Sequence, residues 1–298
     1  MKKNMLLFFL VVGTCQGVQA MSGARAFAHQ VFGSKTAGVA AAVALGTGIS
    51  SYFGHKSIEK ELEALPAVTL SDEHAKEIYD LFGEAGIHNL KIVHGPGAGL
   101  FEGIANTYLS LDCFDLMKLS GDVTRRDFFD EKTEKRTEIL FGRPHVLEII
   151  KHEREHKKQH HTPQQILILN SIVPLSMLSG KAMQVAGRGK AAALAVGVAV
   201  SGMGYLGRFW HSRQCEYAAD RGAADSKRAA FLHAQVLYDL SLFHSSDNGN
   251  LLKKLLRTHP CPEDRIRALE KQWGPLDFCS EQENEAVLAL ALKFSEIK

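Results

Sequence analysis

The chain has 298 residues, of which 45% are hydrophobic and 23% are charged, and its formal net charge is +2. This composition is that of a globular protein with enough material for one large domain or two modest ones. Lysine and arginine are scattered and are not interleaved with aromatic residues, so neither net charge nor charge pattern indicates a nucleic-acid-binding protein.

The first 20 residues have the pattern of an export signal or an N-terminal membrane anchor. Lys2 and Lys3 form a positive start, residues 5–12 are apolar, and residues 18–20 form a small-x-small cleavage site. We therefore expect residues 1–20 to direct the chain to a membrane. Four cysteines follow this segment and permit disulfides without indicating a pairing: Cys113, Cys215, Cys261 and Cys279.

A second apolar segment covers residues 36–53 and is rich in alanine, glycine and valine. Its length of about 18 residues is at the short limit for a membrane span, and its small side chains would equally suit close helix packing. We expect residues 21–56 to be an apolar, membrane-associated segment. After a charged amphipathic stretch, Ser71 is expected to cap a helix that runs to residue 82.

Two short strands are expected next. Residues 89–94 form the first, and residues 104–111, where polar and apolar residues alternate, form a half-exposed second strand. A strand beside a metal-binding helix can pair with an extended peptide, and the alternative is a plain edge strand. Residues 121–136 are heavily charged, and we expect a surface loop with helical turns there.

The central motif of the chain is His152-Glu153-Arg154-Glu155-His156, which has the pattern H-E-x-x-H. The apolar residues 146–150 before it predict a buried helical turn, and on a continuous helix His152 and His156 share one face. Two imidazoles there can bind one zinc ion, and Glu153 would lie where a carboxylate can take a proton from metal-bound water. The alternative is a charged, solvated helix face.

A catalytic zinc site needs a third protein ligand. Thr162 occupies the position of the third histidine in the extended motif, and His160 would lie about 12 Å along the helix axis from His152, which is too far. Glu216 and Asp220, four residues apart, share one helical face. Glu216 can ligate the metal, and Asp220 can accept the second N–H of a ligand histidine. The alternative is a solvated acidic face.

Two apolar stretches, residues 166–180 and 191–207, flank a basic connection. At about 15 and 17 residues they are short for spanning helices, so a membrane-dipping or protein-packed hairpin fits as well as a transmembrane one. If the hairpin enters the membrane, its basic connection should face the cytoplasm, with the catalytic part on the exported, periplasmic side. The alternative is an integral membrane protein whose catalytic part faces the cytoplasm.

Together these motifs resemble the membrane-linked zinc metallopeptidases of the gluzincin type, which include the heat-shock protease HtpX, the CAAX prenyl protease and periplasmic chaperone-proteases. The resemblance rests on the H-E-x-x-H motif, then Glu216-x-x-Ala219-Asp220, then Thr258-His259-Pro260 with Arg265, and it covers roughly residues 71–269. Two features depart from the family pattern. Residues 104–107 are a loose counterpart of an Asn-Ala-Phe-like segment, and Cys261 interrupts the usual double proline.

The resemblance implies one zinc ion per chain, Glu153 as general base and Asp220 as the partner of a ligand histidine. The zinc ligands would be His152, His156 and Glu216. His259 would regulate the site or stabilise the transition state, the alternative being an ordinary loop residue. Arg265 would anchor this loop or bind substrate, the alternative being an ordinary surface arginine.

The expected fold is mostly helical α+β, a zincin-like metallopeptidase core with a small β-sheet and a hydrophobic helical hairpin. The expected segments are a signal or anchor at 1–20, the apolar segment 21–56, a metallopeptidase domain at 57–280 with the hairpin 165–207 inserted, and a C-terminal helix at 281–298.

The expected function is zinc-dependent endoproteolysis of membrane or envelope proteins in quality control. The alternative is a chaperone-like binding protein, weakly active or inactive, that retains a gated zinc site. Expected partners are protein or peptide substrates and a membrane, with no nucleic acid, and the oligomeric state stays open.

Overall fold

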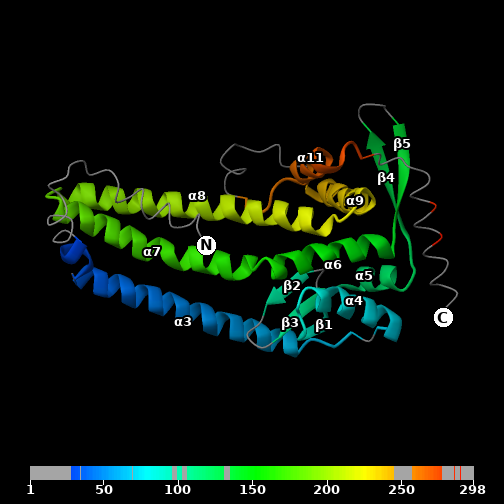
Figure 1. Cartoon of the computed structure of the whole chain (residues 1–298), viewed down its shortest axis with the longest axis horizontal. Coiled ribbons are helices and arrows are strands. Elements are labelled where there is room, and N and C mark those ends of the chain that lie inside the picture. The colour runs from blue at the N-terminus through cyan, green and yellow to red at the C-terminus, as the bar shows by residue number, and fades with distance from the viewer. Residues whose placement is uncertain are drawn as a thin grey trace. The chain divides into compact units, whose positions relative to one another are not determined.

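The computed structural model describes residues 28–276 except 34, 69, 96–98, 103–105, 131–134 and 245–256, and it also describes residues 285 and 289. In this part of the chain, long helices accompany two small sheets (Figure 1), which confirms the mostly helical α+β fold. The predicted signal at 1–20 lies outside the described residues, as does the predicted helix at 281–298 apart from 285 and 289.

The chain divides into two compact units. One comprises the described residues up to Ile49 together with Ile168–Tyr205, and the other comprises Ser50–Leu167 together with the described residues from Leu206 onward. Three helices contribute to both units: α3 (Lys35–Glu63), α7 (His161–Val185) and α8 (Lys190–Ala223). The boundaries that we expect for the metallopeptidase domain, 57–280, stay a prediction.

The larger unit holds both sheets and most of the other described helices. Its elements are α4 (Asp72–Glu84), β1 (Leu90–His94), β2 (Gly99–Glu102), β3 (Thr107–Leu111), α5 (Cys113–Leu119), β4 (Thr124–Asp130), β5 (Lys135–Phe141), α6 (Arg143–Lys158), α9 (Lys227–His244) and α11 (Pro262–Trp273). Ser71 caps α4 by accepting a hydrogen bond from the His74 N–H, as its sequence position predicts.

The first sheet has the strand order β1-β3-β2, with β3 parallel to β1 and antiparallel to β2. β1 confirms the predicted first strand. The expectation that the second predicted strand is half-exposed is wrong, because β3 is the central strand, between β1 and β2, and four of its five residues are buried. The polar tip of Tyr108 on β3 is instead satisfied by Glu63 of α3, whose carboxylate accepts its hydroxyl at 3.1 Å. The strand can therefore be buried although polar residues alternate along it.

A hydrophobic core joins this sheet to α4 and α6. Its buried members include Ile78 and Phe82 of α4, Leu109 and Leu111 of β3, and Ile150 of α6. Burying an apolar side chain of this size contributes about 1.5–3 kcal/mol. This core therefore fixes α6 against the sheet, and α6 is the helix that carries the H-E-x-x-H motif.

Residues 121–136 do not form the expected surface loop. β4 and β5 instead pair as an antiparallel hairpin. Each arginine of β4 has an acidic partner: Arg125 lies 3.4 Å from Glu138, which is diagonal to it across the strands, and Arg126 donates to Asp239 of α9 at 3.0 Å. Ile139 and Phe141 of β5 are buried against α9. Cross-strand charge pairs are compatible with a strand whose other face is packed, and local charge density alone conceals that arrangement.

The apolar stretches of the predicted hairpin are parts of longer helices, because α7 has 25 residues and α8 has 34. Together with α3, these are three helices that are long and apolar enough to cross a membrane. In the smaller unit α7 and α8 lie close together. The hydroxyls of Ser176 and Ser201 are 2.7 Å apart, and a Cβ at Gly204 would approach Ile172 to 2.9 Å. Small residues allow this close approach.

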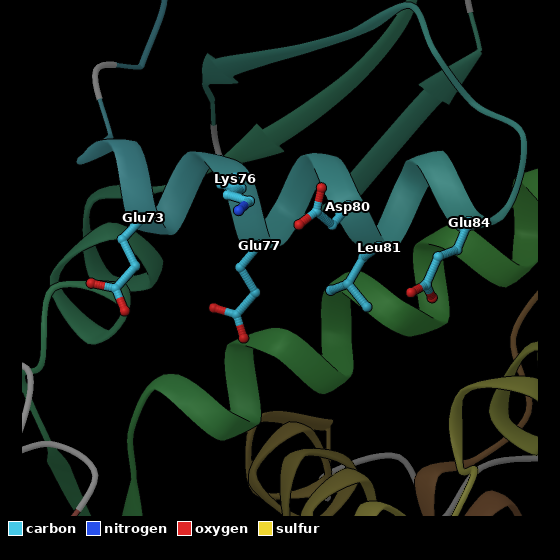
Figure 2. A pocket seen from close by; sticks show the side chains of 6 residues that line it. All are labelled: Glu73, Lys76, Glu77, Asp80, Leu81 and Glu84. Carbon is cyan, nitrogen blue, oxygen red and sulfur yellow. The ribbon is translucent and has the colours of Figure 1, made fainter.

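The outer face of α4 is acidic, as Figure 2 shows, and borders a hollow of about 380 Å³. Arg143, at the first turn of α6, donates to Glu77 on this face and to the carbonyl of Leu119 at 3.1 Å. The buried guanidinium of Arg143 therefore ties the start of α6 to α4 and α5. None of the residues that line the hollow is one of the predicted site residues.

His145 gives the start of α6 a defined pH dependence. The Gly142 N–H donates to its Nδ1 at 3.2 Å, and its Nε2–H donates to Gln235 of α9 at 2.8 Å. Burial lowers the pKa of His145 from 6.5 to about 4. Unfolding therefore takes up a proton between these two pH values, so the stability is complete above pH 6.5 and falls as the pH decreases towards 4, by about 3 kcal/mol for this group.

We expect urea unfolding of the detergent-solubilised protein to show this loss, and His145→Gln to remove most of the His145 contribution. The informative quantity is the difference between wild type and variant in the change of unfolding free energy from pH 7.5 to pH 4.5. Equal pH dependence in the two proteins would contradict the assignment.

Candidate metal centre

Three side chains from two helices converge at one point. His152 and His156 lie one turn apart on α6, and their Nε2 atoms are 3.0 Å apart. Glu216 of α8 places one carboxylate oxygen 3.5 Å from the Nε2 of His152 and the other 3.5 Å from the Nε2 of His156. His152 and Glu216 are buried. The structure therefore brings together the three residues that were predicted as ligands.

These separations fit a zinc ion. Tetrahedral coordination with bonds of 2.0–2.2 Å places two ligand atoms about 3.4 Å apart. The observed separations of 3.0, 3.5 and 3.5 Å lie around that value. The donor set of two imidazole nitrogens and one carboxylate is also one that catalytic zinc sites use.

Asp220, one turn beyond Glu216, organises the surroundings of His152. Its buried carboxylate accepts hydrogen bonds from the Nδ1 of His152 at 2.9 Å, from the Nε2 of His233 at 2.8 Å and from Arg265 at 2.5 and 2.8 Å. Because Nδ1 of His152 donates to Asp220, the neutral form of His152 leaves Nε2 unprotonated, and that atom faces Glu216 and His156.

His152, Asp220 and His233 form a second group whose spacing would suit a metal. Arg265 argues against that use, because its guanidinium donates twice to Asp220 and lies 3.5 Å from the Nδ1 of His152. Both carboxylate oxygens of Asp220 accept hydrogen bonds from Arg265, whereas Arg265 lies near only one oxygen of Glu216, at 3.3 Å. The first group is therefore the better metal site.

The hydrogen bonds around the histidines also set their charge. Burial alone would lower the pKa of His152, but hydrogen bonds to Asp220 and Glu216 outweigh it and raise this pKa to about 9. Burial and the neighbouring His152 lower the pKa of His156 to about 3. His156 is therefore neutral at pH 7, as a ligand must be, whereas a cation has to displace a proton from His152.

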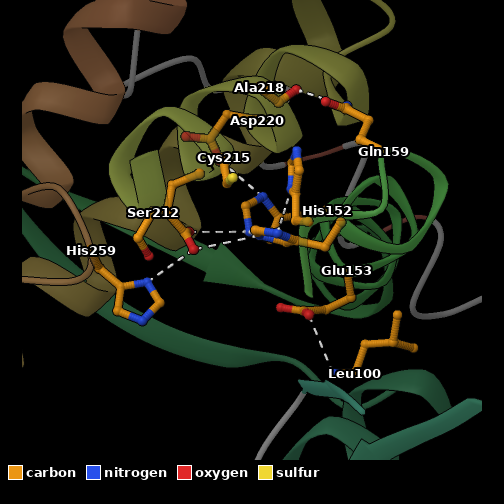
Figure 3. Close-up of polar contacts among 12 residues, drawn as sticks. Leu100, His152, Glu153, Gln159, Ser212, Cys215, Ala218, Asp220 and His259 are labelled. Atoms are coloured by element: carbon orange, nitrogen blue, oxygen red, sulfur yellow. Dashed lines mark hydrogen bonds and ion pairs between the residues drawn. The ribbon is translucent and has the colours of Figure 1, made fainter. Parts of the chain in front are cut away.

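Glu153 lies beside the histidines and faces the edge strand. Figure 3 shows its carboxylate between His152 and Leu100 of β2, whose N–H donates to it at 3.2 Å. Burial raises the pKa of Glu153, and the Leu100 N–H partly opposes that shift. A carboxylate whose pKa is raised accepts a proton more readily at neutral pH, which is the property of a general base.

His259 and Arg265 both contact Glu216. The Nδ1 of His259 lies 3.0 Å from one carboxylate oxygen, and a guanidinium nitrogen of Arg265 lies 3.3 Å from the other. The hydrogen bond to Glu216 raises the pKa of His259. Arg265 is buried, so the alternative of an ordinary surface arginine is wrong. The side chain of His259 is 68% exposed and stands at the solvent side of the site.

Two histidines at the site were missed by sequence reasoning. The Nδ1 of His161 lies 2.8 Å from the Nδ1 of His156, and His233 bonds Asp220. Neither stands at a helical spacing from the motif, so only the tertiary arrangement reveals them. Among the described residues Cys113, Cys215 and Cys261 are free thiols, which leaves no disulfide among these three.

The site has the elements of a metallopeptidase: a helix that bears H-E-x-x-H, a glutamate on a second helix, and a small sheet in the same unit. Residues 138–273 match the model of Peptidase family M48. The resemblance to the membrane-linked zinc metallopeptidases is thereby confirmed. No curated protein and no solved structure matches the chain.

Proposed function

We propose that the protein is a zinc-dependent metalloendopeptidase that holds one zinc ion with His152, His156 and Glu216. The observation that carries this proposal is the convergence of these three donors at separations of 3.0–3.5 Å, with Glu153 beside them. The match of residues 138–273 to the model of Peptidase family M48, a family that is zinc-dependent in general, supports the same conclusion.

A zinc ion in this position would supply a Lewis acid that polarises the scissile carbonyl and lowers the pKa of water. Glu153 then takes a proton from the attacking water and passes it to the departing amine. Asp220 keeps His152 in the tautomer that leaves Nε2 unprotonated. Arg265 bridges the carboxylates of Glu216 and Asp220 and compensates their charge in the buried site.

The edge strand β2 offers a place for an extended peptide. It is one of the two outer strands of its sheet, and of these it is the one whose Leu100 N–H donates to Glu153. A substrate that adds to this edge would have its backbone next to the general base. This assigns to β2 the peptide pairing that the sequence suggested for residues 104–111.

The three apolar helices support association with a membrane. We propose that the substrates are membrane or envelope proteins and that the protease acts in their quality control. Three basic residues around the α7–α8 connection favour a catalytic part on the exported side if the hairpin crosses the bilayer: Lys181 near the end of α7, Arg188 between the helices and Lys190 at the start of α8.

The first test is the zinc content of the purified protein, by elemental analysis. We expect about one zinc per chain in wild type and a sharp loss in Glu216→Ala, because removal of one of three ligands weakens the site. Glu84→Ala is the matched control, since it removes an exposed carboxylate on α4 and should keep the zinc. A folded wild-type protein without stoichiometric zinc would overturn the proposal and favour the chaperone-like alternative.

A further inference from the structure

The second ligand histidine has its own hydrogen-bond partner. His161, the first residue of α7, is buried, and its ring meets that of His156 edge-on, with centroids 4.9 Å apart and planes at 78°. The two Nδ1 atoms are 2.8 Å apart, a distance at which one nitrogen must carry a proton and the other must accept it.

The direction of this hydrogen bond follows from the other side of the His156 ring. Its Nε2 faces His152 and Glu216, and it can serve a metal only with a free lone pair. The proton of neutral His156 is then on Nδ1 and is donated to His161. His161 must in turn hold its own proton on Nε2.

An unusual backbone conformation creates this contact. On a continuous helix, residues five apart point about 140° away from each other, so His161 could not face His156. α6 ends at Lys158, and His160 follows with a φ of 55°, the only positive φ at a non-glycine residue in the described part of the chain. Such a conformation is unfavourable for a side-chain-bearing residue and persists where the surrounding structure requires it. Here it turns the chain so that His161 returns to His156.

We propose that His161 is a positioning residue, which accepts the Nδ1 proton of His156 and so fixes both the tautomer and the ring plane of the second zinc ligand. The inference rests on the proposed zinc site. The two ligand histidines are then oriented differently, His152 by the carboxylate of Asp220 and His156 by a neutral imidazole.

Two variants of the full-length protein test the inference. In His161→Asn the Oδ1 of the new side chain can lie near the place of the His161 Nδ1 and accept the Nδ1 proton of His156. In His161→Leu the side chain fills similar space but has no hydrogen-bond acceptor. We expect His161→Leu to weaken zinc affinity 10- to 100-fold in competition with a chelator, the range found when the partner of a ligand histidine is lost. His161→Asn should stay within about threefold of wild type, since the acceptor remains. At saturating zinc, His161→Leu should lower kcat and leave KM unchanged, because His161 does not contact the peptide.

The outcomes separate the inference from the function on which it rests. A wild type that binds no zinc defeats both. A wild type that binds zinc, with His161→Leu equal to it, overturns only the role of His161. Equal weakening by Leu and Asn would also overturn it, because packing and not hydrogen bonding would then be responsible. If His161→Leu does not fold, nitrogen-15 NMR of histidine-labelled wild type decides: protons on Nδ1 of His156 and Nε2 of His161 support the inference, and the reverse pattern overturns it.

Discussion

Glu153→Gln should reduce peptide hydrolysis by about a thousandfold or more while the zinc content stays that of wild type. Glutamine keeps the size of the side chain and an oxygen for the Leu100 N–H, which donates to Glu153 at 3.2 Å. It cannot take up the proton of the attacking water, so only turnover is lost. Cleavage of a quenched fluorescent peptide, together with elemental analysis of the same sample, measures both quantities.

Glu155→Gln provides the control on the same helix. Glu155 lies within the motif, but its carboxylate is bonded to Arg154 and Gln159, and it packs against Gly222 of α8. We expect its variant to retain zinc and to stay within a few-fold of wild-type activity when folded, because Glu155 contacts none of the three ligands. Full activity of Glu153→Gln would refute the assignment of the general base.

Asp220→Ala should destabilise the protein by about 3–5 kcal/mol, the range expected when one partner of a buried ion pair is removed. The buried guanidinium of Arg265 would lose both hydrogen bonds to this carboxylate, and the rings of His152 and His233 would lose their shared acceptor. The midpoint of urea or thermal unfolding of the metal-free protein measures the effect without interference from zinc.

Asp264→Ala is the appropriate comparison for this variant. Asp264 also pairs with an arginine of α11, Arg267 at 2.6 Å, but both side chains are largely exposed. Exposed ion pairs contribute about 0–1 kcal/mol, so this variant should unfold almost as wild type does. Similar losses in the two variants would show that burial of the Asp220 network does not determine its strength. The double variant Asp220→Ala with Arg265→Leu should recover part of the loss, since the guanidinium that Asp220 pairs is no longer buried without it; the recovery stays partial because Glu216 also loses its contact with Arg265.

The parts of the site that follow helical spacing could be predicted from the sequence. His152 and His156 are four apart, as are Glu216 and Asp220, and such pairs share a face wherever the helix lies. The sequence also indicated that Glu216 should join the histidines, because a zinc site needs a third ligand. The identity of the bound metal and the roles of these residues stay predictions.

What escaped prediction depends on contacts between distant segments. In the central strand β3 the hydroxyl of Tyr108 donates a hydrogen bond to Glu63 of α3. Glu63 is 45 residues away in the sequence, so the local pattern around Tyr108 does not indicate this partner. The β4–β5 hairpin is not evident from the sequence, because a dense run of charges predicts a loop when the partners of those charges, such as Glu138 and Asp239, are not known. His161 was missed because its contact with His156 depends on the left-handed turn at His160, and histidine is not the residue that usually marks such a turn.

The helix α8 runs without interruption from Lys190 to Ala223, and Glu216 lies about 14 Å along its axis beyond Gly207, where the apolar stretch ends. If the apolar stretch crosses a bilayer, the metal centre stays within about three helical turns of the lipid surface, because its third predicted ligand is on the same helix. Peptide bonds close to the membrane surface would then be within reach of the site, and bonds far from that surface would not.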